Sequence, residues 1–164
     1  MPTYAANTSV SVEKSRAEIE TILTRYGASH FGYMTGPGKS IIEFVAEERR
    51  VRFTLPLPDK DAHEFKFVRH KGRYYETERT AEKAHEAWEQ ACRQRWRALR
   101  IAIMAKLEAV QCGISQFEEE FLSYVVDPCT NRTVYESIAE NLQLRYEGKG
   151  TGQLLALPAP RKDD

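Results

Sequence analysis

The stretch TAEKAHEAWEQACRQRWRALRIAIMAKLEAVQ, from Thr80 to Gln111, decides the fold. It contains no Gly or Pro, and almost every residue in it is a strong helix former. At 1.5 Å per residue the predicted helix would be about 48 Å long, longer than most small domains are wide. Apolar residues recur along it at helical spacing. They are Ala84, Trp88, Ala91, Cys92, Trp96, Leu99, Ile103, Leu107 and Val110.

The composition limits what the rest of the chain can be. Its 164 residues suit one domain, and 41% hydrophobic residues are enough to bury a core. Lys plus Arg equals Asp plus Glu, so the formal net charge is zero. This balance argues against a polycation that coats nucleic acid, and any binding patch must come from local clustering of charge.

Three features predict a cytoplasmic protein. No run approaches the roughly 18 apolar residues that a membrane-spanning helix needs. The N-terminal residues MPTYAANTSVSVEKS lack a basic region followed by an apolar one, so we expect no secretory signal. Cys92, Cys112 and Cys129 are odd in number and widely spaced, which favours reduced thiols.

The N-terminal part of the chain is predicted to be an arm followed by a helix. Residues 1–10 are small and polar, which is typical of a flexible arm. Residues 11–26 have a helical pattern, since Ser11 can cap the start and Gly27 can end the helix. Its apolar stripe is formed by Val12, Ile19, Ile22, Leu23 and Tyr26.

A small antiparallel sheet is predicted next. Residues 28–34 form a short aromatic strand, and 35–40 (TGPGKS) form a turn by composition. Residues 41–46 and 50–57 read as a hairpin closed over Glu47-Glu48-Arg49. The second arm alternates between apolar and polar residues, which indicates a sheet with one covered face. Val51, Phe53, Leu55 and Leu57 occupy one face, and Arg50, Arg52 and Thr54 occupy the other.

The segment that leads into the long helix is both charged and aromatic. Within 59–79, the sequence HEFKFVR (63–69) is interpreted as a short fourth strand or as an ordered loop on the sheet. The long helix itself should pack its stripe across the apolar face of the sheet.

Two further helices are expected after the long helix. Gly113 can end the long helix, and Ser115 with Glu118 has the spacing of a capping box. The helix 116–126 would then fold back to form an antiparallel helical hairpin.

A second capping box, Thr133 with Glu136, predicts a last helix that ends near Tyr146. Residues 147–164 contain several Gly and Pro and are predicted to be a flexible tail. The predicted fold is therefore a single α+β domain over 11–146, with a sheet of three to four strands.

Three passages resemble small proteins carried by tailed phages and prophages. They are RRVRFTLPLPD (49–59), AWEQACRQRWRALRIAIMAKLEAVQCGISQFEEEFLSYVV (87–126) and NRTVYES (131–137). The resemblance covers roughly residues 11–146, and the group has no assigned activity. It implies a phage or prophage setting, with the cytoplasm of the host cell as the location, and no catalytic residue follows from it.

The basic and aromatic stretch Glu64–Tyr75 is the first candidate site. Single-stranded nucleic acid is bound by cations that follow the phosphates and by flat rings that stack on the bases. An alternative interpretation is an amphipathic edge strand whose rings are core and whose cations keep the edge soluble. The candidate nucleic-acid-binding residues are Arg50, Arg52, Lys66, Arg69, Lys71, Arg73, Tyr74 and Tyr75.

An arginine row on the long helix is the second candidate. Arg93, Arg97 and Arg100 share one helix face, and Glu89 lies one turn before Arg93. The geometry of the expected hairpin places the acids of the next helix too far away to pair with this row. The row would face solvent, a partner or the acids of the N-terminal helix. The alternative is a solvated face whose aliphatic stems cover the tryptophans.

Other chemistry has little support in the sequence. The four histidines never pair at helical spacing and no C-x-x-C occurs, so no metal or cofactor is predicted. Gly38-Lys39-Ser40 lacks the first glycine of a phosphate loop, because Tyr33 occupies that position. No pair of carboxylates converges, and we therefore predict a protein without enzymatic activity.

Two functional hypotheses follow. The first is a phage accessory protein that binds nucleic acid, preferably single-stranded DNA, in replication or recombination. The second is a module that binds a host or phage protein, or that assembles with itself. Tryptophan and arginine are enriched in such interfaces. A continuous positive surface from Arg50 and Arg52 to Arg69 would favour the first hypothesis, and scattered charge would favour the second.

Overall fold

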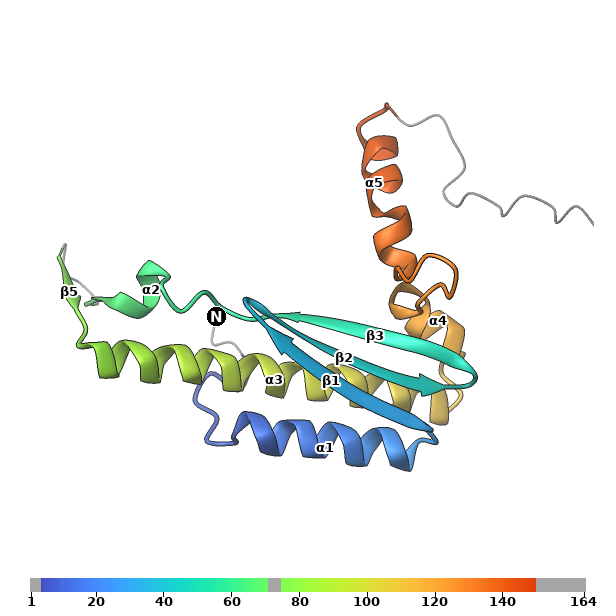
Figure 1. Ribbon diagram of the computed structural model, residues 1–164, viewed down its shortest axis with the longest axis horizontal. Helices are drawn as coiled ribbons and strands as arrows, with labels where there is room; N and C mark the ends of the chain where they lie inside the picture. Colours follow the sequence, from blue (N-terminus) through green and yellow to red (C-terminus); the bar gives the residue numbers. More distant parts are fainter. Residues whose placement is uncertain (1–3, 71–74, 150–164) are drawn as a thin grey trace, which may run out of the picture.

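The computed structural model describes residues 4–70 and 75–149 and confirms the predicted α+β fold. Helices α1 and α3 run beside each other along the three-stranded sheet, and α5 projects from one end of the molecule (Figure 1). In chain order the elements are α1 (Val12–Arg25), β1 (His30–Gly36), β2 (Lys39–Ala46), β3 (Arg49–Pro56), α2 (His63–Lys66), β4 (Phe67–Arg69), β5 (Glu76–Glu78), α3 (Ala81–Gln111), α4 (Phe117–Phe121), the 3₁₀ turn η1 (Leu122–Tyr124) and α5 (Val134–Tyr146).

Helix α3 is the long helix that the sequence predicts. The Thr80 hydroxyl caps it by accepting a hydrogen bond from the backbone N–H of Lys83. Gly113 follows with φ +70°, a left-handed conformation that glycine adopts without steric cost. The predicted stripe faces the core, where the most deeply buried members are Cys92, Trp96, Ile103 and Leu107.

The sheet has the order β1-β2-β3 and is antiparallel throughout. Alternate residues point to α1 and α3, as the period of two in the sequence requires. The buried residues of β2 and β3 meet the buried residues of the two helices in one cluster. That cluster contains Ile19, Leu23, Ile42, Phe44, Ala46, Val51, Phe53, Trp96, Ile103, Leu107, Phe117 and Phe121.

The two turns of the sheet are tighter than predicted. Arg49 pairs with Ala46, so the second turn contains only Glu47 and Glu48 and not Arg49. Both glutamates have positive φ, 48° and 58°, which a two-residue turn needs to match the twist of its strands. Gly36 likewise pairs with Lys39, so the strands extend into the predicted turn 35–40.

Residues 63–69 do not add a fourth strand to the sheet. They form the single helical turn α2 and then β4, which pairs with β5 in a separate two-stranded ribbon. This ribbon lies beside the start of α3, at the end of the molecule far from α5 (Figure 1). Phe65 is buried, so α2 is anchored by one ring rather than by strand pairing.

The segment after α3 differs most from its prediction. Helix α4 folds back, since the Lys106 ammonium on α3 lies 3.1 Å from the Glu120 carboxylate. However, its N-cap is Gln116 rather than Ser115, and Glu119 completes the capping box. The helix ends at Phe121 and not at 126, because the following residues turn toward the edge of β3.

Helix α5 begins as predicted, with Thr133 and Glu136 forming both bonds of the capping box. The Thr133 N–H bond and the Thr133 hydroxyl bond lower the pKa of Glu136. The helix extends to Tyr146, and none of its residues is buried. The first residues of α5 pack against η1, which connects the helix to the rest of the molecule (Figure 1).

The described residues of the predicted N-terminal arm lie along α3. The Gln90 side-chain amide donates to the carbonyl oxygens of Ala6 and Thr8, at 2.9 Å and 3.0 Å. The Gln94 amide donates to the carbonyl oxygen of Tyr4 at 3.1 Å. The C-terminal tail beyond residue 149 lies outside the described residues.

Candidate interaction surfaces

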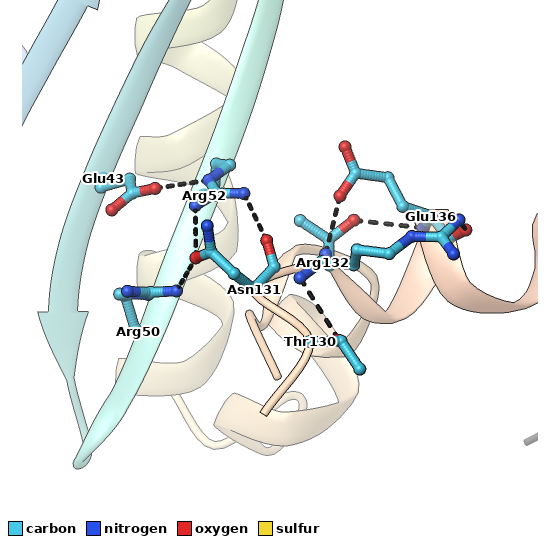
Figure 2. Close-up of polar contacts among 8 residues, drawn as sticks. Glu43, Arg50, Arg52, Thr130, Asn131, Arg132 and Glu136 are labelled. Atoms are coloured by element: carbon cyan, nitrogen blue, oxygen red, sulfur yellow. Dashed lines mark hydrogen bonds and ion pairs between the residues drawn. The ribbon is translucent and has the colours of Figure 1, made fainter. Parts of the chain in front are cut away.

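A polar cluster at the start of β3 contains two of the predicted nucleic-acid-binding residues (Figure 2). Arg50 and Arg52 both donate to the side-chain oxygen of Asn131. Arg52 also donates to the backbone carbonyl of Asn131 at 2.9 Å and forms an ion pair with Glu43 on β2. These guanidinium groups therefore join the sheet to the loop that precedes α5.

The loop that carries Asn131 has a defined shape. The Asp127 carboxylate accepts hydrogen bonds from the Cys129 N–H at 2.9 Å and from the Thr130 hydroxyl at 2.8 Å. The first of these bonds is the main reason that the pKa of Asp127 is lowered. Asn131 has φ +56°, which asparagine tolerates better than most residues. Its side chain can thus point back at β3, where the two arginines hold it.

The basic and aromatic stretch at the other end of the molecule is only partly described. Lys66 pairs with Asp61 at 2.8 Å, and the ion pair raises the pKa of Lys66. Arg69 is exposed at the end of β4. Tyr75 is also exposed. The predicted residues Lys71, Arg73 and Tyr74 lie outside the described residues.

The described residues of the predicted positive surface lie in two separate places. Arg50 and Arg52 lie near the β2–β3 turn, close to the base of α5, whereas β4 lies at the opposite end (Figures 1 and 2). The rings within 64–75 also differ in exposure. Phe65 is buried, and Phe67 is half-buried and stacks on His63 with ring centroids 4.5 Å apart.

The arginine row of α3 pairs within the chain. Arg97 donates to the Glu18 carboxylate on α1, and Arg100 Nε lies 3.1 Å from the same carboxylate. The Arg97 hydrogen bond is the main reason that the pKa of Glu18 is lowered. Of the three possibilities open from the sequence, these two arginines face the acids of the N-terminal helix. Arg93 lies 3.5 Å from Glu89 and donates to the Gln90 side chain.

Two surfaces expose apolar side chains that the sequence did not mark as sites. On β1, Met34 is 66% exposed and Tyr33 is 54% exposed. On α5, Tyr146 is 87% exposed and Leu142 is 39% exposed. The strand His30–Gly36 contains no Lys, Arg, Asp, Glu or Pro, and this lack of charge is the one sign in the sequence that the strand is unshielded.

A cavity of about 260 Å³ lies where α1, α3 and the end of β1 meet. Its lining includes Trp88 and Trp96 from α3 and Thr35 from β1. Arg16 of α1 lies between two rings, 4.6 Å from the centroid of Tyr33 and 4.5 Å from that of Trp96. Its Nε–H is buried and has no acceptor among the described residues.

A second cavity, of about 360 Å³, lies beside the polar cluster. Arg52, Tyr124, Tyr135 and Glu136 contribute to its lining. Arg52 and Glu136 are both engaged in the bonds described above. The cavity therefore separates the base of α5 from the polar face of β3.

Within residues 4–70 and 75–149, no group of three His, Cys, Asp or Glu side chains could hold a metal ion. The described cysteines are free thiols, and burial raises the pKa of Cys92. No helix in this part of the chain is both long enough and apolar enough to cross a membrane.

Comparison of the chain with protein-family models, with curated proteins and with solved structures found no match. The resemblance to phage and prophage proteins therefore stays a prediction.

Proposed function

We propose that this protein acts by binding another protein, as an interaction module without enzymatic activity. The observation that carries the proposal is α5, a helix of 13 residues that leaves the body with no buried residue. Isolated helices shorter than about 12–15 residues are marginal in water. A partner that covers α5 would remove its apolar side chains from water and stabilise the helix.

The occupant that fits α5 is an apolar groove on the partner protein. Tyr135, Ile138 and Leu142 are spaced at i, i+3 and i+7, the pattern by which an amphipathic helix anchors in a groove. Tyr146 extends this face by one turn. The base of the helix is held by Asn131 and the capping box, so the helix is presented in one direction.

The contacts that the arginines make within the chain also support protein binding over phosphate binding. Arg50, Arg52 and Arg97 each donate to an acceptor within the chain, and Arg100 forms an ion pair with Glu18. A phosphate group would have to compete with those acceptors. The described cations of the predicted positive surface lie at two ends of the molecule, with Arg50 and Arg52 at one and Arg69 at the other, which favours an interaction module over a nucleic-acid groove.

The proposal is tested by capture from host lysate after nuclease treatment. Wild type should retain a protein that the double variant Leu142→Glu/Tyr146→Glu loses at least tenfold. The matched control is Asn141→Glu/Gln143→Glu, which adds the same charge to exposed polar positions of α5. Equal capture of the protein by both double variants would contradict binding through α5. Loss of the captured protein on nuclease treatment would contradict direct protein binding.

Binding of single-stranded nucleic acid is the second candidate function. It is favoured by exposed Arg69 at the end of β4, next to the segment with Lys71, Arg73 and Tyr74. An anisotropy titration with a labelled oligonucleotide tests it, with binding that weakens steeply as salt rises. Binding unaffected by Arg69→Ala, or none at low salt, would exclude this candidate. A phage or prophage setting and a cytoplasmic location are part of both proposals.

A further inference from the structure

The outer edge of β1 carries backbone groups that the sheet does not use. The Leu57 N–H donates to the Gly38 carbonyl at 2.8 Å, which continues the β2–β3 ladder by one pair. Bonded pairs alternate in an antiparallel ladder, so even-numbered residues of β2 face β3 and odd-numbered residues face β1. By the register of β1 and β2, the residues whose N–H and C=O point outward are Phe31, Tyr33 and Thr35.

This edge is unprotected in the part of the chain that the structure describes. No backbone hydrogen bond links the outer side of β1 to another described segment. Natural proteins usually shield an edge strand with lysine, proline, a bulge or a covering element. The strand His30–Gly36 has neither a proline nor a side chain with a fixed charge, and Met34 and Tyr33 are exposed on it.

The neighbouring cavity supplies a place for a side chain. It includes Thr35 in its lining, so it begins where the open edge of β1 ends. Trp88, Trp96 and Leu57 give it apolar walls. Two acids and two cations line it as well and balance in charge, namely Glu13, Glu89, Arg16 and Arg93. The cavity therefore favours one large uncharged side chain.

A second copy of this chain fits the edge poorly. Helix α1 lies beside α3, and its Arg16 reaches the end of β1, where it contacts Tyr33 and donates to the Thr35 hydroxyl at 3.2 Å. Pairing of two β1 strands would place them about 4.8 Å apart and would bring the α1 helices of the two copies close together on the same side of the joined sheet. Packed helices need about 8–10 Å between their axes. A single extended segment carries no such helix and avoids the clash.

We infer that β1 accepts an extended, uncharged segment of a partner protein as an added strand, with one large apolar side chain in the cavity lined by Trp88 and Trp96. The inference deepens the proposed function, because it names a second contact and the chemistry of what it takes. Main-chain pairing with Phe31, Tyr33 and Thr35 would supply affinity, and the cavity would supply specificity.

The experiment selects binders from a library of random seven-residue peptides displayed on a carrier. We expect enrichment of peptides with alternating apolar residues and no charge at the centre. Binding of a selected synthetic peptide should change the tryptophan fluorescence, since Trp88 and Trp96 line the cavity. Amide exchange at Tyr33 and Thr35 should slow when the peptide is bound.

A pair of variants isolates the backbone contact. Tyr33→Pro and Tyr33→Ala both lack the ring, but only proline lacks the outward N–H, and proline is tolerated on an edge strand. The proline variant should bind at least tenfold more weakly than the alanine variant. The same peptide methylated on the nitrogens that face β1 should also lose binding, which tests the contact without any change to the protein.

The outcomes are separable from those of the proposed function. Leu142→Glu on α5 should leave peptide binding unchanged, so failure at α5 does not affect this test. The inference is overturned if no peptide family is enriched, or if the proline variant and the methylated peptide bind as well as their controls. If the Tyr33 amide exchanges more slowly as the protein concentration rises, without any peptide, the edge would be assigned to a second copy of the chain.

Discussion

The two outer edges of the sheet are treated very differently. On the β3 side, the Val126 N–H donates to the Arg50 carbonyl at 2.8 Å, and Val125 forms a bridge with Val51. On the β1 side, no such cover exists among the described residues. The chain itself covers the start of the β3 edge, whereas the β1 edge is uncovered in the part of the chain that the structure describes. The fold can therefore cover the edge of an outer strand, as it does at β3, and the lack of cover at β1 is specific to that strand.

The closed edge depends on a buried anchor. Phe121 is fully buried, with its ring edge-on to Phe44 at 6.1 Å and to Phe53 at 6.4 Å between centroids. It fixes the chain a few residues before Val125 reaches β3.

The largest effect is expected from Phe121→Ala. Loss of this ring leaves a cavity between α4 and the sheet and should lower the free energy of unfolding by about 3–5 kcal/mol. Urea unfolding measures the change. The matched control is Leu122→Ala, because Leu122 is 54% exposed in the next position and should change the free energy by at most about 0.5 kcal/mol. Equal effects of the two variants would mean that Phe121 is not the anchor.

A smaller loss is expected from Arg52→Met. The variant keeps most of the side-chain length but leaves Glu43 and the backbone carbonyl of Asn131 without their donor, while Arg50 still donates to the Asn131 side chain. Hydrogen bonds to charged groups are worth about 1.5–3 kcal/mol, and we expect a loss of stability in this range. Amide exchange at Val126 should accelerate, whereas exchange in β1 should not. Arg49→Met, at an exposed position three residues earlier, is the control and should change neither quantity.

The closed edge also shows how far the sequence could predict the structure. Helix α3 and the start of α5 follow from local signals: helical spacing, Thr80, and the pair Thr133 and Glu136. The end of α4 could not be predicted, since Val126 leaves the helical path to bond with Arg50, which is distant in sequence. Local capping rules also favoured Ser115 over Gln116.

The candidate sites were harder to predict than the fold. The sequence left the acids of the N-terminal helix as one of three possible neighbours of the arginine row, but it did not single out Glu18 and gave no sign of Asn131, because both lie about 80 positions away from their arginine partners. The opposite placement of β4 and the Arg50–Arg52 cluster depends on the path of the connection between them. The open edge of β1 had a signal in its lack of charge, but the pattern alone does not say which strand lies at an edge.

The open edge is supported from below by α1, and acid should loosen that support. Glu18 has a lowered pKa in the folded chain through Arg97 and Arg100, so its contribution to stability is complete above the unfolded pKa of about 4.3. It is lost as the pH falls through the folded pKa. At pH 7 Glu18→Gln should therefore cost about 1 kcal/mol.

The difference between wild type and Glu18→Gln should shrink as the pH falls from about 5 to 3. Urea unfolding at several pH values measures this change. Glu20→Gln, an exposed change two residues further along α1, is the control and should follow wild type. A constant difference between wild type and Glu18→Gln across the pH range would exclude the pairing of Glu18 with the arginines.

The smallest effect on stability, and the sharpest contrast between the edges, is expected from a single lysine on each side. Met34→Lys and Thr54→Lys both replace an exposed residue on the sheet, one on β1 and one on β3. Each should change the free energy of unfolding by less than about 0.5 kcal/mol. A lysine at an edge strand opposes the docking of another strand, so only the β1 variant should weaken binding of an extended peptide. The reverse result, with Thr54→Lys the more disruptive, would mean that the two edges had been assigned the wrong way round.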